Sequence, residues 1–221
     1  MKKTAIILGA TGLTGNSLLH KLIEDDRYES IKLFSRTKIK HLPNKVTQFI
    51  GDILNLKQFK TDFTADEVYC CIGTTAKKTP DKNAYKQIDF GIPVTAAKLS
   101  KENNIHTFLV VSALGANTKS SVFYNKTKGE MEQSVLHQKI KNTFILRPSL
   151  IGGKRKERRV LEKIGLIVFN IIQPLFIGKL KQYKIIDAEN IAQAMLNLAN
   201  DFKSDQTIIS SNEIKNISKN K

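Results

Sequence analysis

The chain of 221 residues contains only two cysteines, and these are adjacent, at Cys70 and Cys71. Neighbouring cysteines seldom pair with each other, so a disulfide framework is excluded and a reducing compartment, the cytoplasm, is expected. The four histidines show no metal-ligand spacing with the cysteines, so we expect no metal site. The core must therefore come from apolar burial, and a chain of this length can bury about 70% of its unfolded surface.

The sequence also lacks a long uninterrupted hydrophobic run. The apolar stretch at residues 164–177 contains polar interruptions and is shorter than the roughly 20 residues that a membrane-spanning helix needs. The first apolar run ends at Gly9, which is too early for a secretory signal. We therefore expect no membrane span. The stretch 164–177 could line a pocket, cover it as a lid or form a subunit interface, so a homo-oligomer is left open.

Acidic residues are scarce, with 20 Asp and Glu against 36 Lys and Arg, and the formal net charge is +16. Such a charge attracts polyanions, including nucleic acid, anionic membranes and phosphorylated small molecules. The basic cluster at residues 154–159 contains no aromatic side chain that could stack on bases. We therefore expect no nucleic-acid partner and favour a small-molecule substrate that is anionic.

Short apolar runs alternate with helical periodicity along the chain. The continuous run at residues 5–8 is typical of a strand buried on both faces of a parallel sheet, and the apolar stripe within 14–25 is typical of a helix. Further strands are expected at 31–34, 46–50, 68–72, 108–111, 143–146 and 207–209, and helices in part of 82–103, at 121–138 and around 191–198. The alternation predicts one doubly wound Rossmann domain over 1–221, α/β in class, with about seven mostly parallel strands. Residues 150–221 would contribute a small substrate-side region.

The first predicted strand leads into a glycine-rich turn, Gly9-Ala10-Thr11-Gly12-Leu13-Thr14-Gly15, that opens a helix. In a dinucleotide-binding unit the first glycine makes the turn, the second lets the backbone approach a pyrophosphate, and the third lets helix and strand pack closely. The free amides of the helix N-terminus then bind the phosphates. The predicted phosphate-binding residues are Gly9, Thr11, Gly12, Leu13, Thr14 and Gly15. The alternative is that the glycines serve only a tight turn.

The end of the second predicted strand carries a basic residue where an NAD-binding protein usually carries Asp or Glu. No Asp or Glu lies between Ile31 and Asp52, and Ser35 and Arg36 occupy the strand end. A guanidinium can form two charge-assisted bonds to a ribose 2′-phosphate, which a carboxylate would repel. The segment therefore predicts NADP(H) as the cofactor, with a solvated surface charge as the alternative for Arg36.

Two more strand ends are predicted to border the cofactor, because the carboxyl ends of parallel strands line the ligand site. Asp52 and Ile53 follow the third strand, where Asp52 could bind the adenine amino group or simply cap the next turn. Cys71, Gly73 and Thr74 follow the fourth strand, where the chain should pass under the cofactor; for Gly73 an ordinary turn is equally open.

Tyr124 and Lys128 lie four residues apart in a predicted helix, so both point to one side. Ser112 lies at the end of the fifth predicted strand. An ammonium and an oxidised nicotinamide beside a tyrosine could lower its pKa by about three units, which requires roughly 4 kcal/mol. We predict that Ser112 holds a substrate oxygen while Tyr124 exchanges the proton, with an ordinary surface helix pair as the alternative.

These residues resemble the short-chain dehydrogenase/reductase superfamily, and more narrowly its atypical subfamily named for the mammalian HIV Tat-interacting protein. The resemblance is carried by residues 111–117, by residues 124–130, and by residues 147–152 with Arg155, Glu157 and Arg158. It implies a Rossmann fold that binds NADPH. It also implies catalytic positions at Ser112, Tyr124 and Lys128, and cofactor contacts that include Tyr124, Lys128, Arg147 and Pro148.

One departure from the superfamily is the segment Gln87-Ile88-Asp89-Phe90 in the helix before the fifth strand, where many relatives outside this subfamily carry an asparagine. A proton relay through that asparagine therefore does not carry over to this chain.

The sequence favours an NADP-dependent oxidoreductase that transfers hydride between nicotinamide and a carbonyl or alcohol substrate. One alternative is an NADPH-binding redox sensor or regulatory protein without turnover. Another is a sugar-nucleotide epimerase or dehydratase. Such enzymes usually have a larger substrate region than the roughly 70 residues after Leu150 and use NAD, which Arg36 disfavours.

Overall fold

The computed structural model of the chain describes residues 2–152, 184–200 and 206–220. The basic cluster at 154–159 and the apolar stretch at 164–177 lie outside the described residues, and so do Arg155, Glu157 and Arg158. None of the helices in the described ranges is both long enough and apolar enough to cross a membrane.

The described strands form a seven-stranded sheet in the order β3-β2-β1-β4-β5-β6-β9, and every pair in it is parallel. The strands are β1 (Lys3–Leu8), β2 (Tyr28–Ser35), β3 (Val46–Ile50), β4 (Glu67–Cys70), β5 (Thr107–Val111), β6 (Asn142–Arg147) and β9 (Ile208–Ser210). The strand order reverses between β1 and β4, and ligands of doubly wound sheets bind beyond the carboxyl ends of the strands at this point. The predicted Rossmann fold is confirmed.

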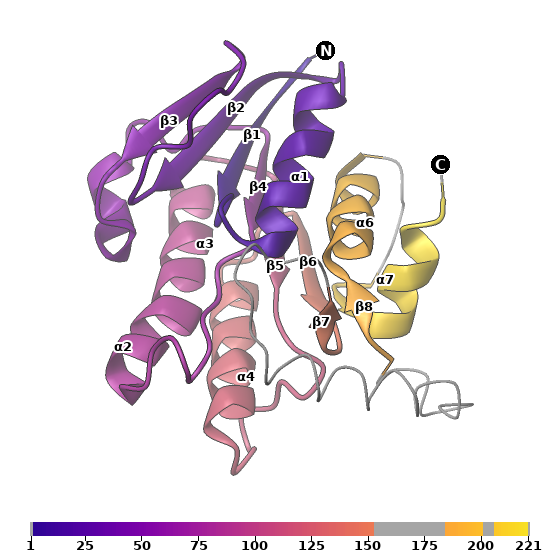
Figure 1. Cartoon of the computed structure of the whole chain (residues 1–221). Coiled ribbons are helices and arrows are strands. Elements are labelled where there is room, and N and C mark those ends of the chain that lie inside the picture. The colour runs from indigo at the N-terminus through magenta and orange to yellow at the C-terminus, as the bar shows by residue number, and fades with distance from the viewer. Residues whose placement is uncertain (1, 153–183, 201–205, 221) are drawn as a thin grey trace.

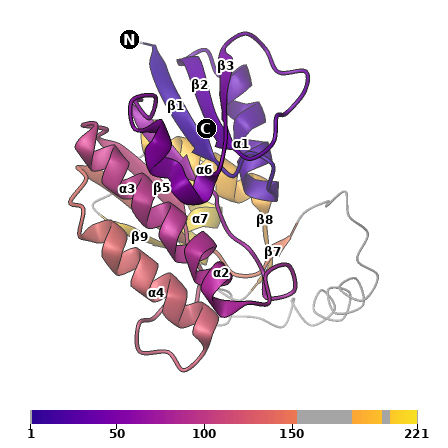
Figure 2. The same cartoon turned by 90° about the vertical axis from the view of Figure 1, so that its left-hand side faces the viewer.

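Helices cover both faces of the sheet (Figures 1 and 2). One face carries α1 (Leu13–Glu24), α6 (Ala188–Asn200) and α7 (Ser211–Ile217), and the other carries α3 (Ile92–Glu102) and α4 (Phe123–Leu136). Successive side chains of a strand point to opposite faces, so Ile7 packs in the first layer and Ile6 in the second. Since both faces are covered, the central strands contain continuous apolar runs, which explains why such runs located them.

The helical segment before β5 is broken into three parts. α2 (Lys82–Lys86) continues into a π-helical turn, η2 (Gln87–Gly91), and then into α3. Pro93 lies in the first turn of α3, directly after the π turn. The π turn places Asp89 on the buried side.

Some elements were not predicted. The 3-10 helix η1 (Ile53–Phe59) and the two-residue strands β7 (Ile151–Gly152) and β8 (Ile186–Asp187) are too short to show a clear hydrophobic period. Helix α7 does carry a signal, because Ser210 and Glu213 form a capping box at its start.

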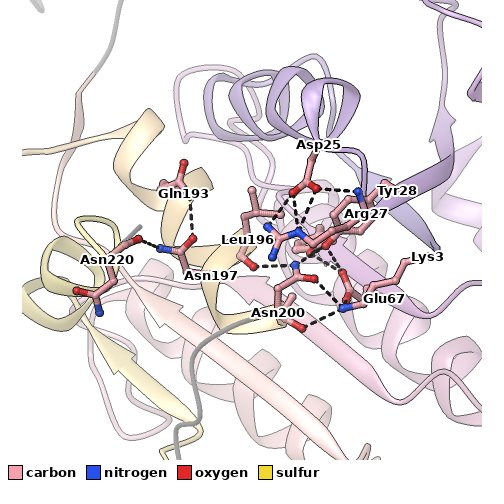
Figure 3. A network of polar contacts seen from close by, with 12 residues as sticks. Lys3, Asp25, Arg27, Tyr28, Glu67, Gln193, Leu196, Asn197, Asn200 and Asn220 are labelled. Carbon is pink, nitrogen blue, oxygen red and sulfur yellow. Dashed lines mark hydrogen bonds and ion pairs between the residues drawn. The ribbon is translucent and has the colours of Figure 1, made fainter. Parts of the chain in front are cut away.

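A polar network closes the amino-terminal end of the sheet, opposite the glycine turn (Figure 3). Glu67 of β4 is 2% exposed and accepts hydrogen bonds from the hydroxyls of Tyr28 at 2.7 Å and Tyr69 at 2.6 Å. Lys3 lies 2.6 Å from the same carboxylate and also donates to Asn200 at the end of α6, at 2.7 Å. The network therefore joins strands β1, β2 and β4 to helix α6.

Candidate active site

The backbone shape of the turn after β1 requires only some of the glycines in that turn. Gly9 has φ +88°, and a Cβ there would lie 2.8 Å from the carbonyl oxygen of Cys71. A Cβ on Gly15 would overlap the carbonyl oxygen of Gly9. Gly12, in contrast, has ordinary extended dihedrals, and a Cβ there would lie 3.3 Å from the oxygen of Gly9. The turn therefore requires Gly9 and Gly15, whereas a bare Cα at the exposed Gly12 mainly keeps the surface open to a ligand.

The N-terminus of α1 has free donors. Gly12 caps the helix without a side-chain hydrogen bond, and its carbonyl accepts from the amide of Asn16 at 2.8 Å. The amides of Leu13, Thr14 and Gly15 precede the first helical hydrogen bond, and the first turn contains no acidic residue. These amides and the helix dipole form an anion-binding end, and Thr11 is exposed beside it.

Arg36 directly follows Ser35, the last residue of β2, and its side chain is exposed to solvent. The hydroxyl of Ser35 donates to the carbonyl of Thr37 at 2.8 Å, which bends the chain away from the strand. Arg36 is exposed and has no hydrogen-bond or ion-pair partner within the part of the chain that the structure describes. Its guanidinium is therefore available to a ligand at the carboxyl end of β2.

At the end of β3, Asp52 caps η1, because its side chain accepts the amide of Leu54 at 3.0 Å. Asp52 therefore caps η1, as one of the two alternatives predicts. Adenine binding by Asp52 stays a prediction. Ile53 is half-buried beside it.

The residues after β4 contribute backbone more than side chains. The thiol of Cys71 contacts the sulfur of Met195 at 3.9 Å, so it points toward α6, and burial raises its pKa. Gly73 is exposed, and the amide of Thr74 donates to Asp89 at 2.7 Å. This loop is therefore tied to η2, which sequence reasoning did not anticipate.

Tyr124, Lys128 and Glu132 form one stripe on α4, because they are spaced four residues apart. Tyr124 is 40% exposed, whereas Lys128 and Glu132 are each 3% exposed. The helix therefore presents a phenol to solvent and holds two ionisable groups beneath it. The predicted pair of Tyr124 and Lys128 lies on one side of the helix as expected.

Lys128 forms a buried ion pair with Asp89, and we refer to these two residues as the buried pair. Nζ of Lys128 lies 2.9 Å from Oδ1 of Asp89, and the side chains are 4% and 1% exposed. Burial alone would lower the pKa of Lys128, but Asp89, Tyr124 and Cys70 together outweigh that effect and hold the pKa above its usual value. Lys128 is therefore a permanent cation at physiological pH.

Tyr124 has a pKa above its usual value. Partial burial raises this pKa, Lys128 lowers it, and Asp89 raises it. The ring of Tyr85 packs edge-on against Tyr124, with centroids 6.4 Å apart. In the protein alone, Tyr124 is thus a phenol at neutral pH.

Ser112 is hydrogen-bonded to a second ion pair, between Glu132 and Arg147, rather than to the buried pair. Its hydroxyl donates to Oε1 of Glu132 at 2.5 Å, and Arg147 binds the same carboxylate through Nε at 2.9 Å and through its terminal nitrogen at 2.5 Å. This pairing raises the pKa of Arg147. Arg147 therefore holds the carboxylate of Glu132 to which Ser112 is bonded. The carbonyl of Pro148 accepts a hydrogen bond from the amide of Leu114 at 3.0 Å.

With its proton donated to Glu132, the oxygen of Ser112 can still accept a hydrogen bond from a substrate hydroxyl. It can donate to a carbonyl oxygen only after leaving Glu132. Sequence reasoning missed Glu132, although an acid four residues beyond Lys128, on the same helix face, was the available signal.

The fold and these residues define a class: a Rossmann-fold protein of the short-chain dehydrogenase/reductase type with a nicotinamide-nucleotide site. A family model described as NAD(P)H-binding matches residues 9–174, so the chain belongs to this NAD(P)H-binding family.

Curated relatives agree with that assignment. The chain is 34% identical over 162 residues to protein FMP52, mitochondrial, of Debaryomyces hansenii, covering 70% of this chain and 69% of the relative. It is 31% identical over 219 residues to protein FMP52-1, mitochondrial, of Scheffersomyces stipitis, covering 93% of both chains. It is also 30% identical over 161 residues to protein HTATIP2 of Rattus norvegicus, covering 71% of this chain and 66% of the relative. The resemblance to the atypical subfamily is confirmed.

Solved structures share the fold. A UDP-glucose 4-epimerase of Thermotoga maritima, solved with UDP-glucose, superposes with a TM-score of 0.69 at 15% identity, over 98% of this chain and 81% of the other. WbmG of Bordetella bronchiseptica, solved with NAD, gives a TM-score of 0.70 at 12% identity, over 99% and 76%.

The expected cytoplasmic location is wrong. The fungal relatives are named as mitochondrial proteins, which points to the mitochondrion rather than the cytoplasm. A low cysteine content indicates a reducing compartment but does not say which membrane encloses it.

Proposed function

We propose that the protein is an NADP-dependent oxidoreductase that interconverts a carbonyl and an alcohol. The observation that carries the proposal is the stripe on α4, where an exposed phenol lies one helical turn from a buried, permanently charged ammonium. A proton donor held beside a fixed cation is the arrangement that general acid–base catalysis needs.

The glycine turn and Arg36, which follows β2, support the choice of cofactor. The amides of Leu13, Thr14 and Gly15 would hold the pyrophosphate, and the exposed Gly12 lets it approach. The free guanidinium of Arg36 would bind the 2′-phosphate of NADP, which NAD lacks. When bound, the nicotinamide supplies or accepts the hydride.

The chain's own residues would then manage the oxygen of the substrate. Tyr124 exchanges the proton with that oxygen, and Lys128 stabilises the phenolate that forms. Ser112 accepts a hydrogen bond from the alcohol form of the substrate, since its own proton is held by Glu132. The substrate is proposed to be anionic, because Lys77, Lys119 and Lys126 are exposed on the loops and helix start at this end of the sheet.

A calorimetric comparison of NADPH and NADH tests the cofactor. We expect NADPH to bind at least about 10-fold more tightly, a difference of about 1.4 kcal/mol. Replacing Arg36 with alanine should abolish this preference. Lys38→Ala is the matched control, since it removes an exposed positive charge two residues away and should keep the preference. Equal dissociation constants in the wild-type protein would contradict the assignment.

The Tyr124→Phe variant tests the chemistry. It should bind NADPH as the wild type does but lose at least about 100-fold in the rate of NADPH oxidation with a responsive carbonyl compound, because the proton donor is gone. An unchanged rate would remove Tyr124 from the mechanism.

A second candidate function is NADPH binding without turnover, as in a regulatory protein. It is favoured by the commitment of the Ser112 proton to Glu132, which leaves a carbonyl oxygen without that donor. Tight NADPH binding, combined with no NADPH oxidation across a broad panel of carbonyl compounds, would select it over the oxidoreductase.

A further inference from the structure

We propose that Asp89 is a positioning residue that offsets the charge of Lys128 beneath Tyr124 and so keeps Tyr124 a proton donor. The inference rests on the proposed function and adds to it a residue that acts on the proton donor through Lys128. The observation behind it is the buried pair, in which Asp89 places a carboxylate against the ammonium one helical turn below Tyr124.

Asp89 connects two parts of the site at once. Its Oδ1 lies 2.9 Å from Nζ of Lys128, and its Oδ2 accepts the amide of Thr74 at 2.7 Å. The carboxylate therefore ties the loop after β4, where the cofactor is expected, to helix α4. Because both side chains are almost completely buried, water screens their charges poorly.

A paired lysine favours a neighbouring phenolate less than an unpaired lysine does. An unpaired cation close to an acidic group lowers the pKa of that group by about 1–3 units. In this site the carboxylate of Asp89 opposes the field of Lys128. The outcome is a pKa of Tyr124 above its usual value, since partial burial and Asp89 raise the pKa and only Lys128 lowers it.

The other titratable groups around the buried pair are uncharged at neutral pH. Cys70 of β4 faces Lys128, and burial raises the pKa of its thiol to about 11. Tyr85 of α2 lies beside Tyr124, and burial raises the pKa of its phenol as well.

Two further charged groups near α4 neutralise each other at the surface. Glu130 of α4 lies 2.7 Å from Lys86 of α2, with side chains 28% and 48% exposed. The charges that act on Tyr124 from within the protein therefore come from the buried pair.

The protonation state matters because the two directions need opposite forms of Tyr124. In reduction, the carbonyl carbon gains a hydride from NADPH, and the carbonyl oxygen gains the proton of Tyr124 as its O–H bond breaks. The products are the alcohol, NADP and a phenolate, which regains a proton from water at the exposed side of the ring. Oxidation instead starts from the phenolate, which is the form that Asp89 disfavours.

The test measures the titration of Tyr124 directly, without nucleotide or substrate. The ultraviolet absorbance of tyrosinate is followed against pH, and the same curve from a matching Tyr124→Phe variant is subtracted. In Asp89→Asn the midpoint of Tyr124 should fall by about one pH unit or more, because Lys128 is no longer opposed. An unchanged or higher midpoint in a folded Asp89→Asn protein would overturn the proposal.

Glu130→Gln is the matched control, because it also turns a carboxylate into an amide and changes the net charge by the same amount. It should leave the midpoint of Tyr124 unchanged. An equal fall in both variants would show a general charge effect and would also overturn the proposal. If the wild-type protein did not bind NADPH, the proposed function would be refuted, but the titration result would still hold.

Asp89→Asn could fail to fold, because one amide oxygen must serve both Lys128 and the amide of Thr74. The comparison is then made between Lys128→Met and the double variant Lys128→Met, Asp89→Asn, in which the amide oxygen faces Thr74 alone. At the alkaline pH where a phenol titrates, even a buried carboxylate is ionised. The double variant should therefore titrate at lower pH than Lys128→Met, and equal midpoints would overturn the proposal.

Discussion

The buried carboxylate of Glu67 is expected to be a large single contributor to stability. In Glu67→Gln the side chain keeps its shape and loses its charge, so both tyrosine hydroxyls bond to a neutral oxygen and Lys3 faces a donor (Figure 3). Hydrogen bonds to charged groups are worth about 1.5–3 kcal/mol each, against about 1 kcal/mol for neutral ones. Two weakened bonds therefore give a loss of about 1–4 kcal/mol.

The ion pair with Lys3 adds little to that value, because Lys3 is 31% exposed and water screens its charge. We take about 2–3 kcal/mol as the expected loss in the free energy of unfolding.

Urea denaturation followed by circular dichroism measures this loss. Glu102→Gln is the control, since Glu102 also pairs with a lysine at 2.6 Å but lies at the surface, and its unfolding midpoint should not move. A change below about 0.5 kcal/mol in Glu67→Gln would refute the reasoning, because surface substitutions produce effects of that size.

Three further predictions concern other parts of the fold. Burial raises the pKa of Tyr69, so near pH 10 the unfolded chain releases the proton of this phenol while the folded protein keeps it. The stability of the protein should therefore fall above about pH 10. In Tyr69→Phe the urea midpoint should fall less steeply with rising pH than in the wild type. Gly15→Ala should prevent stable folding by overlap with the Gly9 carbonyl, whereas Gly12→Ala should fold within about 1 kcal/mol of the wild type and lose NADPH affinity in calorimetry. Arg147→Gln should cost about 3 kcal/mol in urea denaturation, because it leaves the buried Glu132 without its partner.

Much of the fold could be predicted from the sequence because its signals are local. A parallel sheet covered on both faces needs continuous apolar strands, and such runs at β1, β4 and β5 stand out from the surrounding residues. The glycine turn is equally local, since Gly9 and Gly15 are required by contacts within a few residues and with the neighbouring strand. The placement of Tyr124 and Lys128 on one side of α4 follows from helical spacing.

The partners of the catalytic candidates could not be predicted in the same way. Asp89 reaches Lys128 across 39 residues of sequence, and the π turn that buries it gives no periodic signal. Glu67 begins a strand and looks like a surface acid until Tyr28 and Asn200 enclose it from distant elements. In each case the role of a charge depends on which distant group neutralises it, and short-range spacing contains no information about that group.

Two ion pairs packed against α4 explain how one helix can carry an exposed phenol above two ionisable groups and still be stable. A buried charge is tolerated when an opposite charge and hydrogen bonds compensate it, and α4 buries Lys128 against Asp89 and Glu132 against Arg147. The partners come from two separate elements, η2 and β6, and bind the same stripe of α4, so the two pairs together fix the rotation of the helix about its axis. With that rotation fixed, the remaining group of the stripe, Tyr124, is directed to solvent. The exposure of the candidate proton donor thus depends on two ion pairs that lie beneath it.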